Sequence, residues 1–325
     1  MDTLIQKCFL VEEELVQVEQ RLQQIIRTGG PEIGEVGSYI FNGSGKRIRP
    51  TLFLLAAYRK RGNLIPLIDG AVAMELLHTA SLLHDDVIDQ STIRRGKGTV
   101  HTRWSNKISV LTGDYLLSQS FKLLVAYKDW LLLDIIVDVV QNMTEGEMEQ
   151  AFANVDTGEL EQRYFQWIGK KSASFFAGCC QAGSHLSGGD NSEQSRWADY
   201  GFNLGLAFQL IDDLLDYTGK GSLTGKPILG DLTNRVITLP LIRTLSTSNN
   251  SENLYRILHD ENSNESDLEA VVKEVLTGDG PQYTYDRARE YVAKACEVLN
   301  EMNDLPTEIK SALQEMTEDV LKRKK

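Results

Sequence analysis

Two copies of the pattern D-D-x-x-D constrain this chain more than any other feature of its sequence. They consist of Asp85, Asp86 and Asp89 in LLHDDVID, and of Asp212, Asp213 and Asp216 in FQLIDDLLD. Both copies lie in apolar segments with helical periodicity, in which side chains at i and i+4 share one face about 5–6 Å apart. Like charges at that spacing repel each other, so each pair requires a cation. Because Mg²⁺ is usually held by one or two carboxylates and by substrate phosphate oxygens, the two faces predict a multi-Mg²⁺ site for a phosphate-bearing substrate. Accidental clustering in an acidic chain is the weaker explanation, since both copies are flanked by apolar residues.

The composition excludes several classes of protein. A chain of 325 residues that is 42% apolar can bury a large core. Its net charge of −12 argues against a nucleic-acid binder, whose binding surface would be basic. The N-terminal segment has no basic region before an apolar core, and no apolar run approaches the length of a membrane span, so neither a signal peptide nor a transmembrane helix is expected. The four cysteines form no disulfide or zinc pattern, which favours a cytoplasmic protein.

Helical periodicity continues along nearly the whole chain and predicts an all-α fold. Helices are expected from about residue 4 to 27 and at 31–42, 50–61, 64–90, 107–127, 129–154, 158–187, 192–217, 236–247, 251–260, 265–276, 281–302 and 306–324. Helix starts are marked by proline at Pro31, Pro66, Pro281 and Pro306, and Ser192 is the expected N-cap of the helix with the second acidic motif. Neither a linker nor a convincing strand interrupts this pattern, so residues 1–325 are expected to form one domain.

Three irregular segments separate the helices, and all are basic and rich in glycine. They are NGSGKRIRP (42–50), QSTIRRGKGTVHT (90–102) and GKGSLTGKPILGDLTN (219–234). Glycine lets the backbone approach a ligand closely, and the planar fork of arginine suits phosphate. Each cluster alone is typical of a solvated surface, but together in an acidic chain they predict anion binding. The residues concerned are Lys46, Arg47 and Arg49; Arg94, Arg95 and Lys97; Lys170 and Lys171 before Ser172; and Lys226.

Two uncharged polar residues share the faces of the acidic motifs. His78 lies about two helical turns before Asp85, and spacing alone leaves open whether it binds a ligand or packs in the core. Gln209 lies three residues before Asp212. Its amide oxygen either faces a developing positive charge or makes a core hydrogen bond.

Taken together, several segments resemble the trans-polyprenyl diphosphate synthases, the family that elongates isoprenoid chains. The segments are GKRIRP, LLHDDVIDQSTIRRGKGTVH, GKKSA, FQLIDDLLDYTG and DLTNRVITLPLI, which cover about residues 40–245 in family order. The related class I terpene cyclases differ, because their second metal motif is of the N-x-x-x-S-x-x-x-E kind. The resemblance implies a single-domain isoprenoid synthase bundle of about 10–14 helices around a central cavity. It also implies head-to-tail condensation of isopentenyl diphosphate with an allylic diphosphate.

The resemblance further implies roles for individual residues. Three Mg²⁺ ions would bind the allylic diphosphate, two on Asp85 and Asp89 with Asp86 supporting, and one on Asp212 and Asp216. Neutralisation of that diphosphate is expected from Arg94, Lys171 and Lys226, and binding of isopentenyl diphosphate without metal from Lys46, Arg49, His78 and Arg95. The Gln209 amide and the Ser172 hydroxyl would shield the allylic cation, so the residues expected to act in catalysis are Asp85, Asp89, Asp212, Lys171 and Gln209. Arg235 and Val236 stand where many family members carry Gly-Lys, so a diphosphate-binding lysine is missing there.

Product length is expected to depend on small residues one turn before the first motif. A growing tail that runs beside this helix passes Ser81 and then Ala80, while Leu77 and Met74 lie deeper. Bulky aromatic residues at these positions close the tunnel early in short-chain family members. The small residues therefore predict a product of about six to eight isoprene units, as for a quinone side chain, with a floor formed partly by a helix near residues 129–140.

Several alternatives accompany this interpretation. A short-chain synthase that makes farnesyl or geranylgeranyl diphosphate is disfavoured by Ala80 and Ser81. A non-catalytic subunit would lack the acidic motifs, and a helical scaffold with calcium sites would need an EF-hand loop that the sequence lacks. Both a homodimer and a heterodimer with a small regulatory subunit remain open. The C-terminal LKRKK is expected to be disordered, with folding over the diphosphates as the alternative.

Overall fold

The computed structural model describes residues 9–42, 45–58, 64–153, 159–218, 232, 236–260 and 263–323. This part of the chain is almost entirely helical, which confirms the predicted all-α fold. Its helices are η1 (Phe9–Val11), α2 (Glu12–Thr28), α3 (Pro31–Phe41), α4 (Ile48–Ala56), α5 (Ile65–Ile88), α6 (Val100–Arg103), α7 (Asn106–Val125), α8 (Trp130–Ala151), α9 (Leu160–Ile168), the π-helix η2 (Gly169–Ala173), α10 (Ser174–Leu186), α11 (Asn191–Thr218), α14 (Leu239–Thr247), α15 (Ser251–His259), α16 (Glu265–Thr277), α17 (Gly280–Glu301) and α18 (Thr307–Leu321).

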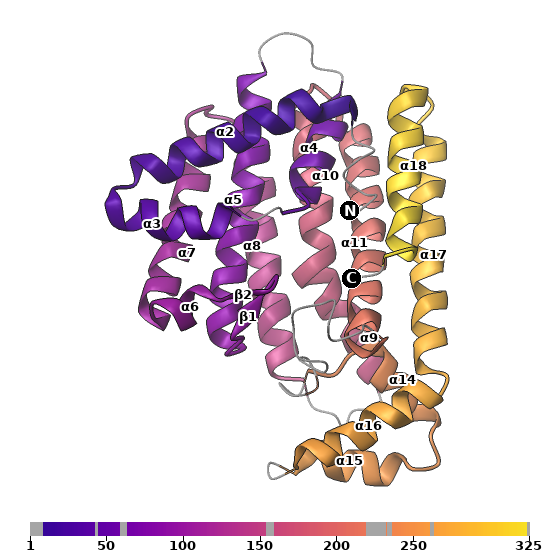
Figure 1. The fold of residues 1–325 in the computed structure, drawn as a ribbon. Helices are drawn as coiled ribbons and strands as arrows, with labels where there is room; N and C mark the ends of the chain where they lie inside the picture. The colour runs from indigo at the N-terminus through magenta and orange to yellow at the C-terminus, as the bar shows by residue number, and fades with distance from the viewer. Residues whose placement is uncertain are drawn as a thin grey trace.

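The helices surround two central ones, α10 and α11, which pack along each other (Figure 1). On one side α10 contacts α4, α5 and α8, and α7 packs along α5. On the other side α17 and α18, drawn in orange and yellow, run alongside α11 (Figure 1). The short helices α14, α15 and α16 lie together at one end of the molecule (Figure 1). The helices that carry the two acidic motifs, α5 and α11, therefore lie on opposite sides of α10.

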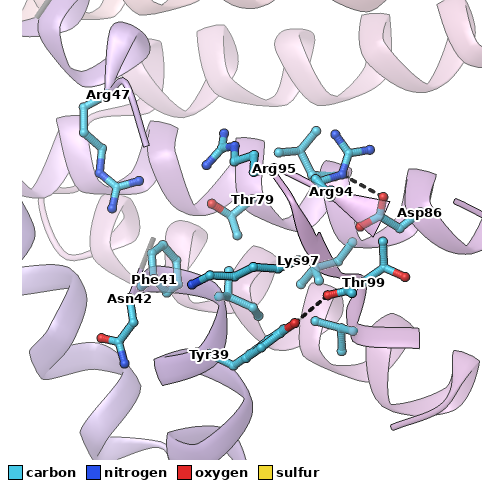
Figure 2. A pocket seen from close by; sticks show the side chains of 15 residues that line it. Tyr39, Phe41, Asn42, Arg47, Thr79, Asp86, Arg94, Arg95, Lys97 and Thr99 are labelled. Atoms are coloured by element: carbon cyan, nitrogen blue, oxygen red, sulfur yellow. Dashed lines mark hydrogen bonds and ion pairs between the residues drawn. The ribbon is translucent and has the colours of Figure 1, made fainter. Parts of the chain in front are cut away.

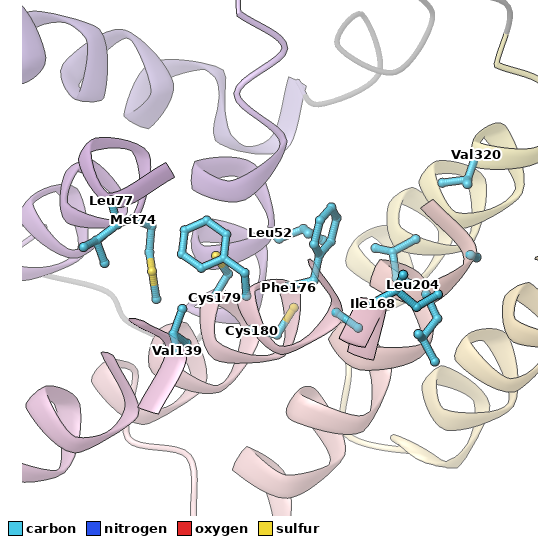
Figure 3. Close-up of a cluster of buried hydrophobic side chains, with 14 of the residues drawn as sticks. Leu52, Met74, Leu77, Val139, Ile168, Phe176, Cys179, Cys180, Leu204 and Val320 are labelled. Carbon is cyan, nitrogen blue, oxygen red and sulfur yellow. The ribbon is translucent and has the colours of Figure 1, made fainter. Parts of the chain in front are cut away.

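The core passes through α10 and joins these layers. Phe176, Cys179 and Cys180 of α10 are buried between Met74 of α5 and Leu204 of α11 (Figure 3). Burial raises the pKa of the Cys179 thiol to about 12, so this cysteine behaves as an apolar core residue. In the described part of the chain, Cys179, Cys180 and Cys296 are free thiols.

The structure differs from the predicted helices at three places. The segment 158–187 is not one α-helix, because the π-helix η2 separates α9 from α10. Helix α11 is capped by Asp190, whose Oδ1 accepts a hydrogen bond from the Glu193 N–H at 2.8 Å, and not by Ser192. The segment 90–102 contains a hairpin of β1 (Ile93–Arg94) and β2 (Lys97–Gly98). Its two turn residues, Arg95 and Gly96, both have positive φ, as a tight two-residue hairpin turn requires.

Two glycines let neighbouring helices approach the π-helix closely. A Cβ on Gly205 of α11 would lie 2.7 Å from the Ala173 Cα, and one on Gly146 of α8 would lie 2.6 Å from the Lys171 nitrogen. The backbone of the π-helix therefore packs directly against the backbones of α8 and α11 at these two glycines. This packing brings Lys171 and Ser172 close to side chains of both helices.

Helix α5 is the one helix in the described residues that is long and apolar enough to cross a membrane. No such segment was expected from the sequence. Most of the apolar stretch of α5 is buried inside the molecule, and the helix carries Asp69, Glu75, Asp85 and Asp86. It is therefore a core helix.

Candidate active site

Two adjoining cavities lie beside the first acidic motif, the larger between α5, α8, the π-helix and α11 and the smaller between α5, α7 and α8. The larger, of about 730 Å³, is lined among others by Asp89, Glu147, Tyr164, Lys171, Ser172, Gln209 and Asp213. The smaller, of about 260 Å³, is lined by Leu77, Ala80, Ser81, His84, Asp85, Ile88, Leu117, Val140, Met143, Thr144, Glu147 and Lys171. Ile88, Glu147 and Lys171 belong to both linings, so the cavities meet there. The structure thus brings together Asp85, Asp89, Lys171, Ser172 and Gln209, which the sequence analysis assigned to one site.

Asp85 is a partly buried carboxylate near the junction of the two cavities. Burial raises its pKa to about 6, and the negative charges of Glu147 and Asp89 add to that shift, while Lys171 opposes it. The charged form of Asp85 is therefore disfavoured when nothing is bound. Most of this cost comes from burial, and repulsion by Asp89, the i+4 neighbour, adds a smaller part.

Lys171 projects from the π-helix toward the same junction. Its Nζ forms an ion pair with Glu147 and donates a hydrogen bond to Gln150 Oε1 at 3.0 Å. Burial lowers the pKa of Lys171, but the charges of Glu147 and Asp85 outweigh burial and hold it above its ordinary value. Lys171 is therefore a fixed positive charge beside the first acidic motif. Lys170 points elsewhere and pairs with Glu145 and Glu149.

The Asp86 side chain does not line either of the two cavities that Asp85 and Asp89 line. Its side chain is 3% exposed, and its Oδ1 accepts a hydrogen bond from Arg94 Nε at 2.7 Å. Both residues line a separate cavity of about 340 Å³ between α3, α5 and the hairpin, together with Arg95, Lys97 and Tyr39 (Figure 2). One of the two dashed lines in Figure 2 marks the Arg94–Asp86 pair, and the other marks the hydrogen bond from the Tyr39 hydroxyl to the Gly98 carbonyl. Asp86 thus positions Arg94 in this structure.

A cationic cluster forms around His78, as the sequence analysis expected. Arg49 Nη1 donates to His78 Nε2 at 3.0 Å, and the guanidinium lies over the rings of Phe175 and Phe176 at 4.9 and 5.1 Å. Burial lowers the pKa of His78 well below its ordinary value, and the charges of Arg49, Arg95, Arg94 and Arg47 lower it further. His78 is therefore neutral at physiological pH and accepts a hydrogen bond from Arg49.

Arg49 is a buried cation that lacks full hydrogen bonding. Its Nε is buried with no hydrogen-bond partner in the described part of the chain. Burial, with a smaller contribution from the charge of Arg95, lowers its pKa to about 10. A buried guanidinium of this kind is stabilised when a multivalent anion binds beside it.

Arg47 has a different role from the cations on either side of it. It adopts a left-handed backbone conformation before α4 and pairs with two acids, Glu19 and Glu75. The Arg47 Nη1 to Glu75 Oε1 distance is 2.6 Å, and Glu75 is 4% exposed. Arg47 is thus neutralised within the protein, whereas Lys46 and Arg49 on either side of it were the residues assigned to the substrate.

The second acidic motif carries an unexpected cation. Arg323 Nη2 donates to Asp212 Oδ1 at 3.1 Å, and its guanidinium lies 3.9 Å above the ring of Phe208. Disorder of the C-terminal LKRKK was expected, and this is wrong for Arg323, whose side chain is mostly buried on α11. Lys324 and Lys325 lie outside the described residues. The Asp216 carboxylate follows Asp212 one turn later on α11.

Gln209 is held by hydrogen bonds at both ends of its amide. Its Oε1 accepts from the Ser172 hydroxyl at 2.6 Å, and its Nε2 donates to Asp213 Oδ1 at 2.7 Å. The other oxygen of Asp213 accepts from the Tyr164 hydroxyl at 2.5 Å. Of the two alternatives that the sequence left open for Gln209, the structure shows the hydrogen bond within the protein, which holds the amide oxygen beside Ser172.

The donor set of the site suits a hard divalent cation. Carboxylates come from both motifs, the pKa of Asp85 is raised by burial, and Asp212 already binds a positive group, Arg323. Within the described residues, no group of three His, Cys, Asp or Glu is assembled as a metal site by the protein alone. Mg²⁺ sites often have this character, since substrate phosphates and water complete the coordination.

Some functional residues fall outside the described part or were missed. Lys226 and Arg235 lie outside the described residues, and Val236 lines the larger cavity. Glu147, Tyr164 and Arg323 were not anticipated. For Tyr164 a signal existed, because it lies two helical turns before Lys171 in the same predicted helix.

Comparisons with known proteins agree with this arrangement. A family model described as polyprenyl synthetase matches residues 31–275. The chain is 33% identical over 305 residues to the octaprenyl diphosphate synthase of Haemophilus influenzae, covering 94% of this chain and 92% of that protein. It is 31% identical over 288 residues to the heptaprenyl diphosphate synthase component 2 of Bacillus subtilis, covering 89% and 82%. A polyprenyl synthase from Caulobacter crescentus, solved with calcium and isoprenyl diphosphate, matches with a TM-score of 0.92 at 29% identity over 100% of this chain and 99% of that chain.

Proposed function

The chain belongs to the polyprenyl synthetase family and is a prenyltransferase, and from this premise we propose that it makes a medium- or long-chain all-trans polyprenyl diphosphate. It would do so by Mg²⁺-dependent head-to-tail condensation of isopentenyl diphosphate with an allylic diphosphate. The observation that carries the proposal is that two differently built sites for diphosphates lie close together, one that would bind through metal ions held by carboxylates and one that would bind directly through cationic side chains. Acidic side chains with Lys171 face one cavity, and Arg49 with neutral His78 forms a metal-free cationic site nearby.

The proposed reaction needs no side-chain nucleophile or base. The carbon–oxygen bond of the allylic diphosphate breaks, and its electron pair leaves with pyrophosphate. The double bond of isopentenyl diphosphate then forms the new carbon–carbon bond, and the proton lost from the product passes to the departing pyrophosphate. His78 is unsuited as a base, because burial and the neighbouring arginines lower its pKa and the Arg49 guanidinium occupies its Nε2.

Asp85, Asp89, Asp212 and Asp216 would hold Mg²⁺ ions together with the allylic diphosphate, three ions being expected. The ions, when bound, stabilise the charge that grows on the leaving pyrophosphate. The protein itself contributes Lys171, whose raised pKa keeps it charged beside the same diphosphate. Arg49, His78, Lys46 and Arg95 would orient isopentenyl diphosphate.

The smaller cavity supports a long product. Ala80 is buried, and the Ser81 hydroxyl donates to the His78 carbonyl at 2.9 Å, so neither side chain protrudes as an aromatic ring would. Beyond them the wall is formed by Leu117 of α7 and by Val140 and Met143 of α8. Val140 lies at the end of the segment 129–140 that was expected to contribute to the floor, and we propose α8 as that floor helix. A product of about six to eight isoprene units, suited to a quinone side chain, remains our proposal.

Replacing Ala80 or Ser81 by Phe is expected to shorten the product. An aromatic ring at either position would fill the cavity just below Asp85, since overpacking a close-fitting wall leaves no room for a tail. Products from wild type and both variants would be sized by chromatography after dephosphorylation. Leu276→Phe is the matched control, because Leu276 is exposed on α16 and does not line this cavity. Unchanged product length in both variants would contradict the tunnel assignment.

We propose that the enzyme is cytoplasmic, forms one domain and works as a dimer. Several apolar residues of α7 and α8 are exposed, including Val110, Leu111, Val125, Trp130, Leu131 and Val137. Trp130 is 78% exposed, and apolar surface of this kind marks protein–protein contact. The partner is a second copy or a small regulatory subunit. Similarity to a protein named heptaprenyl diphosphate synthase component 2 supports the second possibility.

The decisive experiment is incubation of the purified chain with Mg²⁺, farnesyl diphosphate and isopentenyl diphosphate, followed by sizing of the product. Elongation to a medium or long chain would support the proposal, and a product of geranylgeranyl length would identify a short-chain synthase. Light scattering on the same sample gives the oligomeric state. If the chain alone is inactive and elongates the substrate only when a partner subunit is added, the enzyme is a heterodimer.

A further inference from the structure

We propose that Asp213 and Tyr164 are positioning residues that fix the Gln209 amide with its oxygen toward the reacting allylic carbon. The inference rests on the proposed prenyl transfer and deepens it. It also assigns a role to the middle aspartate of the second acidic motif, which the metal-binding interpretation leaves without one.

The hydrogen bonds of Asp213 leave one orientation for the neighbouring amide. Asp213 is 5% exposed, and each of its oxygens accepts a hydrogen bond from a protein side chain, Oδ1 from Gln209 and Oδ2 from Tyr164. A carboxylate only accepts hydrogen bonds, so the NH₂ group of Gln209 must face it. A flipped amide would place its oxygen against a buried carboxylate. The Gln209 oxygen is therefore directed to the opposite side, where it accepts from Ser172.

Tyr164 keeps Asp213 in this position. Its ring is fully buried and packs edge-on against Phe165 and Trp167, with centroids 5.4 and 5.7 Å away. The hydroxyl is thus fixed where it occupies the second oxygen of Asp213. On α11, moreover, Asp213 is turned about 100° from Asp212, so its carboxylate leaves the face that carries the outer aspartates.

The first motif divides its aspartates in the same way. Asp86 is buried and holds Arg94, just as Asp213 is buried and holds Gln209. In both helices the middle aspartate holds a neighbouring polar side chain, while Asp85 and Asp89 line the cavities and Asp212 pairs with Arg323. The parallel supports a positioning role for Asp213 independently of its own hydrogen bonds.

The fixed oxygen lies where it can act on the reaction. Gln209, Ser172, Asp213 and Tyr164 all line the larger cavity beside Lys171. A dipole that is oriented before the reaction stabilises a developing positive charge without reorganisation at that moment. An amide free to rotate would present its NH₂ group to the cation for part of the time and lose this effect.

The test compares Tyr164→Phe and Asp213→Asn with wild type at saturating substrates. Tyr164→Phe removes one hydroxyl and keeps the ring, and we expect kcat to fall about tenfold. Asp213→Asn introduces a donor that allows the amide to flip, and we expect a fall of about 10²-fold. In both variants the KM for isopentenyl diphosphate and the Mg²⁺ concentration for half-maximal rate should stay within about twofold of wild type, because neither residue binds them.

Tyr200→Phe is the matched control. Tyr200 is also a buried tyrosine, and its hydroxyl bonds to Thr317 of α18, away from the cavities. Its kcat should equal that of wild type. If Asp213→Asn does not fold, as a thermal melt would show, Tyr164→Phe decides the question, since the loss of one hydroxyl preserves packing.

Each result has a distinct meaning. A kcat of wild-type size in Tyr164→Phe, or in a folded Asp213→Asn, would overturn the proposal. A large rise in the Mg²⁺ requirement of Asp213→Asn would also overturn it, because Asp213 would then be a metal ligand. Absence of elongation by the wild type with any allylic primer or partner would instead refute the proposed function, and would appear before any variant is compared.

Discussion

Replacing Asp85 by Asn is expected to lower kcat/KM on the order of 10³-fold while it raises the stability of the ligand-free protein. The loss of rate follows from removal of a carboxylate that would bind Mg²⁺ at the leaving diphosphate. Asparagine has nearly the same size and retains a neutral oxygen, so packing at the junction of the cavities should be preserved. Asp85→Asn therefore tests the effect of the carboxylate charge while the shape of the side chain stays nearly the same.

The gain in stability follows from the direction of the pKa shift. Burial raises the pKa of Asp85 from 3.8 to about 6. Between these two pH values the folded protein keeps a proton on Asp85 that the unfolded chain has lost, so the folded state loses stability as the pH rises across this range. The stability from this group is complete below about pH 4 and is lost as the pH rises through about 6. At pH 7 the free energy of unfolding of the variant should be about 1–2 kcal/mol larger than that of wild type, and the difference should shrink toward pH 4.

Thermal melts from pH 4 to 8 without metal, beside a steady-state assay, would measure both effects. Asp199→Asn is the control, because Asp199 is exposed on α11 and its replacement should change neither quantity. Rate near the wild-type value in Asp85→Asn would contradict the metal assignment. Lower stability at pH 7 would contradict the electrostatic account.

Replacing Arg49 by Gln is expected to raise the KM for isopentenyl diphosphate by about 10²-fold or more. A buried guanidinium gives strong charge-assisted hydrogen bonds to a diphosphate, and truncating such a group costs about 2–5 kcal/mol of binding. The ligand-free protein should tolerate the change. The Arg49 Nε has no partner in the described part of the chain, and burial lowers the pKa of the group to about 10, so its charge is disfavoured in the fold.

Arg47→Gln, two residues away, should behave in the opposite way. Arg47 pairs with Glu75, which is buried, and its removal leaves that acid without this partner at a cost of about 3 kcal/mol. Its melting temperature should fall clearly, with a smaller change in KM. Calorimetric binding of isopentenyl diphosphate and thermal melts on both variants provide the comparison. Equal effects of the two substitutions would show that the cluster acts only as a diffuse positive charge.

The sequence predicted the helices well because apolar periodicity persists through nearly every element. The starts of α3, α5 and α17 coincide with the prolines that were expected to mark them. Asp85, Asp89, Lys171 and Gln209 line the two adjoining cavities, since helical spacing fixes which side chains share a face, whereas Asp212 pairs with Arg323.

Other features depend on contacts between distant parts of the chain. The direction of Asp86 and Asp213 is set by partners on the hairpin and on α9, and motif spacing carries no information about those partners. Arg323 reaches Asp212 from 111 residues away. The hairpin at 93–98 was missed because strands of two residues are too short for an alternating pattern to be recognised.

The π-helix at Gly169–Ala173 has a consequence for the register of the chain. A π-turn amounts to one extra residue within an otherwise continuous α-helix. Deleting a single residue there would join α9 and α10 into one regular helix and rotate Tyr164 by about 100° relative to Phe175. Tyr164 and Phe175 would then no longer face Asp213 and Arg49 together. The number of residues between these two aromatic side chains is therefore as strict a requirement of the site as their identity.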